Sequence, residues 1–290
     1  MKILVSGSTG QLGQELQAIA SKYKQCNFDF RDRRGLDLSS KTAITNTLRN
    51  SDYDYFINAG AYTAVDHAET DHKKAFSVNS RALQHIGKSA PTTTKVLHIS
   101  SDYVYHIDPK RPLKETDKTQ PKGIYAQSKR EGELNLLKQR PDSLIIRTSW
   151  VYSSFGNNFV KTMLRLGKSQ DYLSIVSDQL GTPTYARDLA KVLMTMITKM
   201  QKQPELKAKC GYYNYSNLGL TDWSGFAKEI FKQAGITCKV GYTTTAAYNA
   251  PAPRPLWSML SKEKIQTDFH IDIAEWQKSL SNCLKELNLR

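Results

Sequence analysis

Tyr125 and Lys129 lie four residues apart in the segment Ile-Tyr-Ala-Gln-Ser-Lys, and they are the strongest candidates for chemistry in this chain. Residues with this spacing are neighbours on one face of a helix. Because a nearby ammonium favours the charged form of a phenol, we expect Lys129 to lower the pKa of Tyr125 below its ordinary value of about 10. A tyrosine tuned in this way is suited to protonate a carbonyl oxygen during reduction.

The spacing needs support from its context. With 15 Tyr and 41 Lys plus Arg among 290 residues, chance alone predicts about two such pairs. No other tyrosine has Lys or Arg four residues further on, and this pair follows a polar cluster, Ser100 to Tyr103. The alternative is a packed aromatic side chain beside a solvated lysine. Ser101 and the glycine loop described next favour the catalytic interpretation.

A glycine-rich motif, Gly7-Ser-Thr-Gly10-Gln11-Leu12-Gly13, stands between a short apolar run and apolar residues at helical spacing. Glycines let the backbone turn sharply and approach a pyrophosphate, and the start of a helix offers free N–H groups to an anion. The motif therefore predicts a dinucleotide-binding loop. Its G-x-x-G-x-x-G spacing differs from that of the common dehydrogenases.

The residues after the second apolar run indicate which dinucleotide is bound. An arginine there can meet the 2′-phosphate of NADPH, and an acidic residue can hold the ribose hydroxyls of NADH. We expect NADPH, with NADH as the alternative. The arginines are Arg31, Arg33 and Arg34, the acidic residues are Asp29 and Asp32, and the residues placed to reach the adenine are Asp37 and Leu38.

Apolar runs alternate with helix-like segments through the first half of the chain. This alternation predicts an α/β fold, a doubly wound parallel sheet of Rossmann-like type with helices on both faces. The runs are 2–6, 27–30, 55–58, 95–100 and 143–148, and the longer helix-like segments are 73–89 and 125–138.

Past Trp150 the alternation gives way to loops rich in Gly, Asn and Pro between shorter helices, such as 159–166, 223–233 and 273–287. We expect residues 1–150 to form a dinucleotide-binding domain, with returning segments from 171–216. Residues 151–170 and 217–290 are expected to form a smaller substrate-binding lobe.

Composition limits the partners. The net charge of +14 is spread along the chain without a basic arm, which indicates a solvated surface and an anionic small-molecule substrate and argues against nucleic acid. A DNA-binding redox sensor would have to show salt-dependent binding. Mean hydropathy is −0.52, and no apolar stretch approaches the roughly 20 residues that span a bilayer. We expect a cytoplasmic protein that does not bind membranes.

The cysteines, histidines and acidic residues of this sequence do not occur at spacings typical of a metal site. The four cysteines are scattered, which fits free thiols in a reducing compartment. A cluster of acidic residues and histidines includes His67 and His72, which are five residues apart and so do not share a helical face. We interpret this cluster, Asp66, His67, Glu69, Asp71 and His72, as a solvated helix start and expect no metal.

Further motifs extend over nearly the whole chain. They are Asn58-Ala-Gly-Ala-Tyr-Thr63-Ala-Val-Asp66-His-Ala-Glu69, Ile99-Ser-Ser-Asp102-Tyr-Val-Tyr, Arg147-Thr-Ser-Trp150-Val-Tyr, Asn157-Asn-Phe-Val-Lys-Thr-Met, Asp178-Gln-x-Gly-Thr-Pro-Thr184 and Arg254-Pro-x-x-Ser258-x-Leu. Together with the glycine loop and the Tyr125 pair, they resemble the extended short-chain dehydrogenase/reductases, and within them the dTDP-4-dehydrorhamnose reductases.

This resemblance implies reduction of the C4 ketone of a dTDP-linked 6-deoxy-4-keto hexose, with dTDP-L-rhamnose as the product. Tyr125 would protonate the forming alkoxide, Ser101 would donate a second hydrogen bond to it, and Lys129 would hold the nicotinamide ribose. The resemblance also implies cofactor contacts at Ala61, Tyr62 and Thr63, and nucleotide-sugar contacts at Ser101, Asp102, Tyr103, Trp150, Asn158 and Arg254.

The chain departs from the family pattern at several positions. Ser101 stands where Thr is usual, Gly60 replaces an Ala, and His106-Ile-Asp-Pro-Lys replaces an Asp/Gly-rich turn. These loop changes bear on sugar specificity. A reductase for another nucleotide-linked deoxysugar is therefore an alternative, as is a non-catalytic dinucleotide-binding regulatory subunit, against which the intact Ser101, Tyr125 and Lys129 speak. A homodimer is compatible with the sequence.

Overall fold

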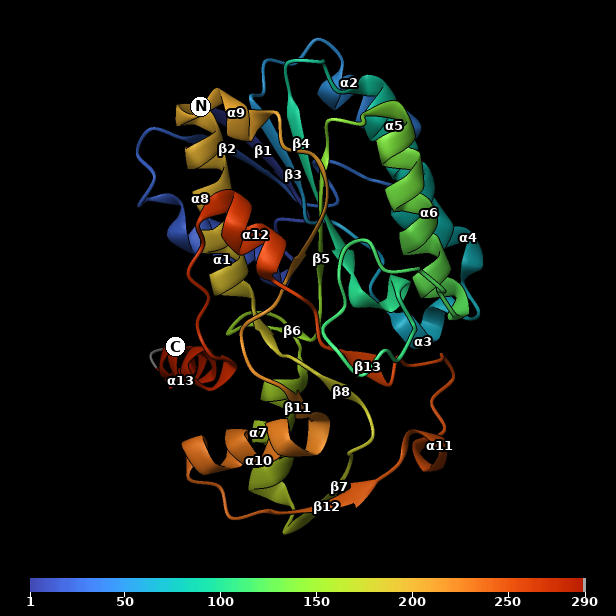
Figure 1. Cartoon of the computed structure of the whole chain (residues 1–290), viewed down its shortest axis with the longest axis vertical. Coiled ribbons are helices and arrows are strands. Elements are labelled where there is room, and N and C mark those ends of the chain that lie inside the picture. Colours follow the sequence, from blue (N-terminus) through green and yellow to red (C-terminus); the bar gives the residue numbers. More distant parts are fainter. Residues whose placement is uncertain (289–290) are drawn as a thin grey trace.

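The computed structural model describes residues 1–288, and within them a six-stranded sheet forms the centre of the larger part of the molecule (Figure 1). All neighbouring strands in it are parallel. The predicted doubly wound, Rossmann-like α/β fold is confirmed. Across the sheet the order is β10 (Gly211–Tyr215), β5 (Leu144–Thr148), β4 (Lys95–Ser101), β3 (Tyr55–Asn58), β1 (Lys2–Ser6) and β2 (Asn27–Arg31).

Helices cover both faces of this sheet because its strands are apolar on both sides. Successive strand residues point to opposite faces, so Ile3 and Val5 join one core and Leu4 joins the other. The first core is covered by α1 (Gln11–Ala20) and α8 (Ala186–Lys202), and the second by α2 (Lys41–Leu48), α5 (Ala82–Ser89) and α6 (Gly123–Gln139).

The helix predicted over 73–89 has a widened segment in its middle. It consists of α4 (His72–Phe76), the π-helical η1 (Ser77–Arg81) and α5. Helix α6 lies against η1 so closely that a Cβ on Gly132 would be 1.9 Å from the Asn79 carbonyl oxygen. Only glycine fits at this crossing.

The smaller part of the molecule has its own core around Phe226 and Leu280. Its main helices are α7 (Phe159–Ser169), α10 (Trp223–Ala234) and α13 (Trp276–Asn288). Three small sheets lie in this part and at its border. In the first, β7 (Tyr172–Val176) pairs with β12 (Lys239–Thr243), and in the second, β8 (Leu180–Gly181) lies between β11 (Thr221–Asp222) and β13 (Trp257–Ser258). In the third, β6 (Val151–Tyr152) pairs with β9 (Thr184–Tyr185). The remaining short helices are α3 (Val65–Ala68), η2 (Asp102–Val104), α9 (Pro204–Lys207), α11 (Thr245–Tyr248) and α12 (Glu263–Phe269).

The chain returns to the main sheet after its first excursion into the smaller part. Helix α8 packs on α1, and β10 extends the sheet beside β5. Strand β7, at the start of the expected returning range, instead pairs with β12. Helix α12 packs on β10 and α8, because Ile265 and Phe269 join the first core. We therefore propose a division in which α8, β10 and α12 belong with residues 1–150.

The close crossing at Gly132 gives a test of this packing. We expect Gly132→Ala to lower the free energy of unfolding by about 2 kcal/mol, because the added methyl group forces α6 away from η1. Urea denaturation followed by circular dichroism measures this change. The matched control is Gln127→Ala, at an exposed position of α6. Equal stability of the two variants would show that α6 and η1 are not in such close contact.

Candidate active site

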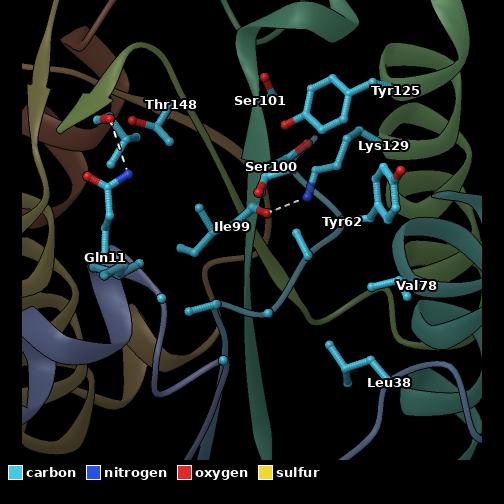
Figure 2. A pocket seen from close by; sticks show the side chains of 18 of the residues that line it. Gln11, Leu38, Tyr62, Val78, Ile99, Ser100, Ser101, Tyr125, Lys129 and Thr148 are labelled. Carbon is cyan, nitrogen blue, oxygen red and sulfur yellow. Dashed lines mark hydrogen bonds between the residues drawn. The ribbon is translucent and has the colours of Figure 1, made fainter. Parts of the chain in front are cut away.

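A cavity of about 720 Å³ opens at the carboxyl ends of β1, β3 and β4. Strand β1 leads to β2 on one side and pairs with β3 on the other, so the order of strands reverses direction here. In open parallel sheets, ligands bind outside the strand ends at such a switch point. Figure 2 shows Gln11, at the start of α1 (Gln11–Ala20), on one side of this space and the side chains of Tyr125 and Lys129 from α6 on the other, with β4 between them.

The glycine loop forms one wall of the cavity. Gly7 has a positive φ of +69°, and a Cβ on it would lie 2.6 Å from Gly60 Cα. Helix α1 then begins at Gln11 without a side-chain cap, so within the described chain the first N–H groups of this helix, including that of Leu12, are free to meet an anion. These features fit the pyrophosphate of a dinucleotide. Gly13 lies behind the loop and does not line the cavity.

The three arginines after β2 lie in different places. Arg33 lines the cavity together with Asp37 and Leu38. The Arg31 guanidinium instead forms a two-point ion pair with Asp29, with distances of 2.7 and 2.9 Å. Arg31 lines a smaller neighbouring hollow of about 430 Å³. The structure thus points to Arg33 as the cavity arginine. Arg31 was the arginine expected to contact the cofactor; it does not line this cavity, and its contact stays a prediction.

One amide side chain holds the loop that carries Ala61, Tyr62 and Thr63, all of which line the cavity. Asn79 Oδ1 accepts a hydrogen bond from the Tyr62 N–H at 2.9 Å, and Asn79 Nδ2 donates to the Tyr62 carbonyl at 3.0 Å. The same Nδ2 donates to Ser128 Oγ on α6 at 3.1 Å. The cofactor loop is therefore tied to the helix that carries Tyr125.

Ser101, Tyr125 and Lys129 come together at the opposite wall from the glycine loop (Figure 2). Ser101 ends β4, and the other two lie one turn apart on α6. Lys129 Nζ donates to the Ile99 carbonyl oxygen at 2.8 Å, which fixes α6 against β4. The predicted grouping of the three residues is thus present in the structure, while their catalytic roles stay predictions.

The prediction that Lys129 lowers the pKa of Tyr125 is wrong. Burial raises the pKa of Tyr125 well above its ordinary value, and a hydrogen bond with Ser101 offsets only part of this effect. Burial also lowers the pKa of Lys129 to about 8. Burial penalises the charged form of each group, and for both groups it is the largest cause of the pKa shift. Tyr125 consequently keeps its proton at neutral pH.

Asp102 is a buried carboxyl group beside Ser101, with 2% of its surface exposed. Ser101 Oγ donates to its Oδ1 at 3.0 Å, and Ser258 Oγ donates to its Oδ2. Burial raises the pKa of Asp102 to about 6 despite these bonds. Ser258 was not among the predicted site residues, although it lies in the Arg254-Pro-x-x-Ser258-x-Leu motif.

Trp150 closes the cavity toward the smaller part of the molecule. Its ring stacks on that of Trp223, with centroids 3.8 Å apart and planes 15° apart. Trp150 has a positive φ of +48°, which is uncommon for a bulky residue and needs support from its surroundings. Trp223 from α10 supplies that support, and nothing in the sequence links these distant residues.

Two residues expected to contact the substrate do not line the cavity. Asn158 caps α7, and its Nδ2 donates to Gln11 Oε1 at 3.0 Å, while its neighbour Asn157 lines the cavity. Arg254 pairs with the Asp66 carboxylate at 2.7 and 2.9 Å. It also contacts the phenol of Tyr103, which does line the cavity. Both substrate contacts therefore stay predictions.

The acidic cluster near residue 69 has structural contacts. Asp66 binds Arg254, and Glu69 Oε1 accepts from the Ile124 N–H at the start of α6 at 2.7 Å. Residues 1–288 contain no group of three or more His, Cys, Asp or Glu side chains that could hold a metal ion. Over the same range, every helix is too short or too polar to cross a membrane.

Comparisons with known proteins agree with this geometry. A family model described as RmlD substrate binding domain matches residues 1–289. The dTDP-4-dehydrorhamnose reductase of Aggregatibacter actinomycetemcomitans is 38% identical to the chain, and the match covers 97% of this chain and 97% of the relative. That of Escherichia coli K12 is also 38% identical, and the match covers 99% of this chain and 98% of the relative.

Solved structures of reductases with the same name are closely similar. That from Clostridium acetobutylicum has a TM-score of 0.92 at 34% identity, covering 99% of this chain and 100% of its own. That from Bacillus anthracis, in complex with NADP, has a TM-score of 0.90 at 31% identity, and the match covers 98% of this chain and 99% of the relative. The full-length family match, the identities and the shared fold show that this chain belongs to the dTDP-4-dehydrorhamnose reductase family.

Proposed function

We propose that this protein reduces the C4 ketone of dTDP-4-dehydro-L-rhamnose to give dTDP-L-rhamnose, with NADPH as the hydride donor. The observation that carries the proposal is the meeting of Ser101, Tyr125 and Lys129 in the cavity that the glycine loop also lines. Relatives named for this activity support the choice of substrate.

The residues present fit the cofactor. Gly7 leaves room for close approach of a pyrophosphate, and the uncapped start of α1 offers N–H groups to it. The solved structure of the Bacillus anthracis relative, 31% identical to this chain, is a complex with NADP. When bound, NADPH supplies the hydride that is added to the ketone carbon.

Tyr125 acts as the proton donor in this proposal. A ketone that accepts hydride develops negative charge on its oxygen, which needs an acid within hydrogen-bond reach. The phenol of Tyr125 is protonated at neutral pH and can give its proton to that oxygen. Burial raises the pKa of Tyr125 and so makes it a weaker acid than a free tyrosine, which means that its position beside the ketone oxygen, rather than its acidity, suits it to this role.

Ser101 has to change its hydrogen bond to assist. Its hydroxyl has a single proton, which it donates to Asp102 at 3.0 Å. Turning toward the substrate oxygen would remove that bond, and Ser258 would remain as the side-chain donor to Asp102. Ser258 therefore lowers the cost of releasing Ser101 for the reaction.

Lys129 holds the nicotinamide ribose in this proposal. With a pKa of about 8, it is mostly charged at neutral pH and can donate hydrogen bonds to ribose hydroxyls while it retains its bond to the Ile99 carbonyl.

The wall formed by Trp150 and Trp223 supports a nucleotide-sugar substrate at the other end of the cavity. The net charge of +14 favours the approach of an anionic diphosphate. We also propose a cytoplasmic location, consistent with free cysteines at all four positions. A homodimer stays a prediction.

The role of Tyr125 is tested with dTDP-4-keto-L-rhamnose and NADPH, by following the absorbance of the reduced cofactor. We expect Tyr125→Phe to lower kcat by about 10²- to 10⁴-fold, the usual contribution of a positioned general acid. Tyr248→Phe, at a residue 63% exposed, serves as the control with normal turnover. Unchanged turnover in Tyr125→Phe would remove this tyrosine from the mechanism.

The role of Arg33 is tested by comparing NADPH with NADH. We expect Arg33→Ala to raise KM for NADPH about tenfold, because a charge-assisted hydrogen bond to the 2′-phosphate is lost, and to change KM for NADH little. Arg34→Ala removes a neighbouring charge outside the cavity lining and is the matched control. Equal effects of Arg33→Ala on both cofactors would contradict a 2′-phosphate contact.

A further inference from the structure

Three polar side chains form a buried row beneath the cavity, across the adjacent strands β1, β3 and β4. Ser6 pairs in register with Asn58, and Asn58 pairs with His98. All three lie two residues beyond Leu4, Phe56 and Val96, which point into the core under α6. By the two-residue period of strands they point to the same face. Each has an exposed fraction of 1% or less.

The row ends at Lys129. Ser6 Oγ lies 2.7 Å from Asn58 Oδ1, and Asn58 Nδ2 lies 3.1 Å from His98 Nδ1. His98 Nε2 in turn lies 3.4 Å from Lys129 Nζ. Buried polar groups are usually retained only where each finds a partner. The mechanism above uses Lys129 but leaves this histidine and its neighbours without a role.

Donor and acceptor counting allows two hydrogen-bond patterns along the contacts from Ser6 to Lys129. With Lys129 neutral, His98 carries its proton on Nε2 and donates to the amine, Nδ1 accepts from Asn58 Nδ2, and Ser6 donates to Asn58 Oδ1. The atoms of Asn58 are placed for this pattern.

With Lys129 charged, the pattern reverses. The ammonium donates to His98 Nε2, the imidazole carries its proton on Nδ1, and that proton is donated to Asn58 Oδ1. The Asn58 amide is turned by 180°, and its NH₂ group donates to Ser6 Oγ. The imidazole is neutral in both patterns. The two patterns differ by one proton overall. The Lys129 ammonium gives up that proton to the cavity that it lines, and the imidazole, which keeps one proton throughout, changes from the Nδ1 tautomer to the Nε2 tautomer.

We propose that His98 is a positioning residue for Lys129, and that the Ser6, Asn58 and His98 row reverses its hydrogen bonds as a unit when Lys129 gains or loses its proton. His98 thereby accepts a hydrogen bond from the Lys129 ammonium when Lys129 is charged and donates one to the Lys129 amine when it is neutral. The role of Lys129 in catalysis rests on the proposed function, but the reversal itself does not.

The charges around Lys129 are consistent with this arrangement. Glu133 on α6 raises the pKa of Lys129, but it is itself paired with Arg147 of β5 and Arg130. From β4 come the Ile99 carbonyl and His98, and Tyr125 lies one turn away. Burial, followed by the charge of Lys129, holds the pKa of His98 well below its ordinary value, so the imidazole stays neutral over the range in which Lys129 titrates.

The kinetic test uses two substitutions, each of which retains a hydrogen-bonding group at the position of one of the two ring nitrogens of His98. Glutamine places an amide where Nε2 lies and retains the contact with Lys129, whereas asparagine places one where Nδ1 lies and loses that contact. In His98→Asn, loss of the acceptor should move the alkaline limb of kcat/KM for keto-sugar reduction about one pH unit lower, because a hydrogen bond to a charged group is worth about 1.5 kcal/mol. His98→Gln should retain the wild-type limb.

In a third variant, Asn58→Asp, we expect the alkaline limb of kcat/KM to shift in the opposite direction. Asn58→Asp can only accept, so it favours the pattern in which Lys129 is charged, and it should move the alkaline limb to higher pH. Thermal unfolding of all variants monitors folding. A merely structural role for His98 would change unfolding temperatures while leaving the pH limb in place in each folded variant, and that result would overturn the proposal.

A spectroscopic test needs no activity and is made on the unsubstituted row, with a row variant used only to assign the signals. In protein labelled with ¹⁵N-histidine, the Nδ1 and Nε2 shifts of His98, assigned by their loss in His98→Gln, should exchange tautomer values between pH 6.5 and 9.5. They should not do so in Lys129→Met. A single tautomer across this range overturns the inference. If the wild-type protein lacks turnover with the keto sugar but shows the exchange, the proposed function fails and the inference stands.

Discussion

A buried ion pair between α6 and β5 is the contact on which the arrangement of the site depends. Glu133 accepts two hydrogen bonds from Arg147, at 2.8 and 2.7 Å, and the two residues are 0% and 1% exposed. The guanidinium also lies over the rings of Tyr105 and Tyr212. A buried charge that loses its partner costs about 3–5 kcal/mol. The pair therefore sets the position of α6 along β5, one turn beyond Lys129.

This position places the functional side chains of α6. Lys129 reaches the Ile99 carbonyl, Tyr125 faces Ser101, and Glu69 binds the start of the helix. The close crossing at Gly132 and the three hydrogen bonds of Asn79 then join α6 to the cofactor loop. One helix is thus both a layer of the fold and the carrier of Tyr125 and Lys129, so a shift in its packing displaces both side chains in the cavity wall.

Much of this arrangement could be predicted from local pattern. The apolar runs and the glycine motif predict the parallel sheet and the cofactor loop, because strand burial and tight turns depend on neighbouring residues. The pKa of Tyr125 could not be predicted, since spacing shows the neighbouring charge but not the burial that opposes it. Arg31 and Arg33 look equivalent in the sequence, and only the ion pair with Asp29 separates them.

Local sequence patterns establish the fold class and the family and predict the candidate site residues, because motif residues are close along the chain and their spacing carries the information. Which groups meet across long distances follows only from the tertiary structure. Trp223 supports Trp150, Ser258 binds Asp102, and the row from Ser6 to His98 ends at Lys129. Such contacts depend on strand register and helix packing, which bring together residues that no local spacing relates.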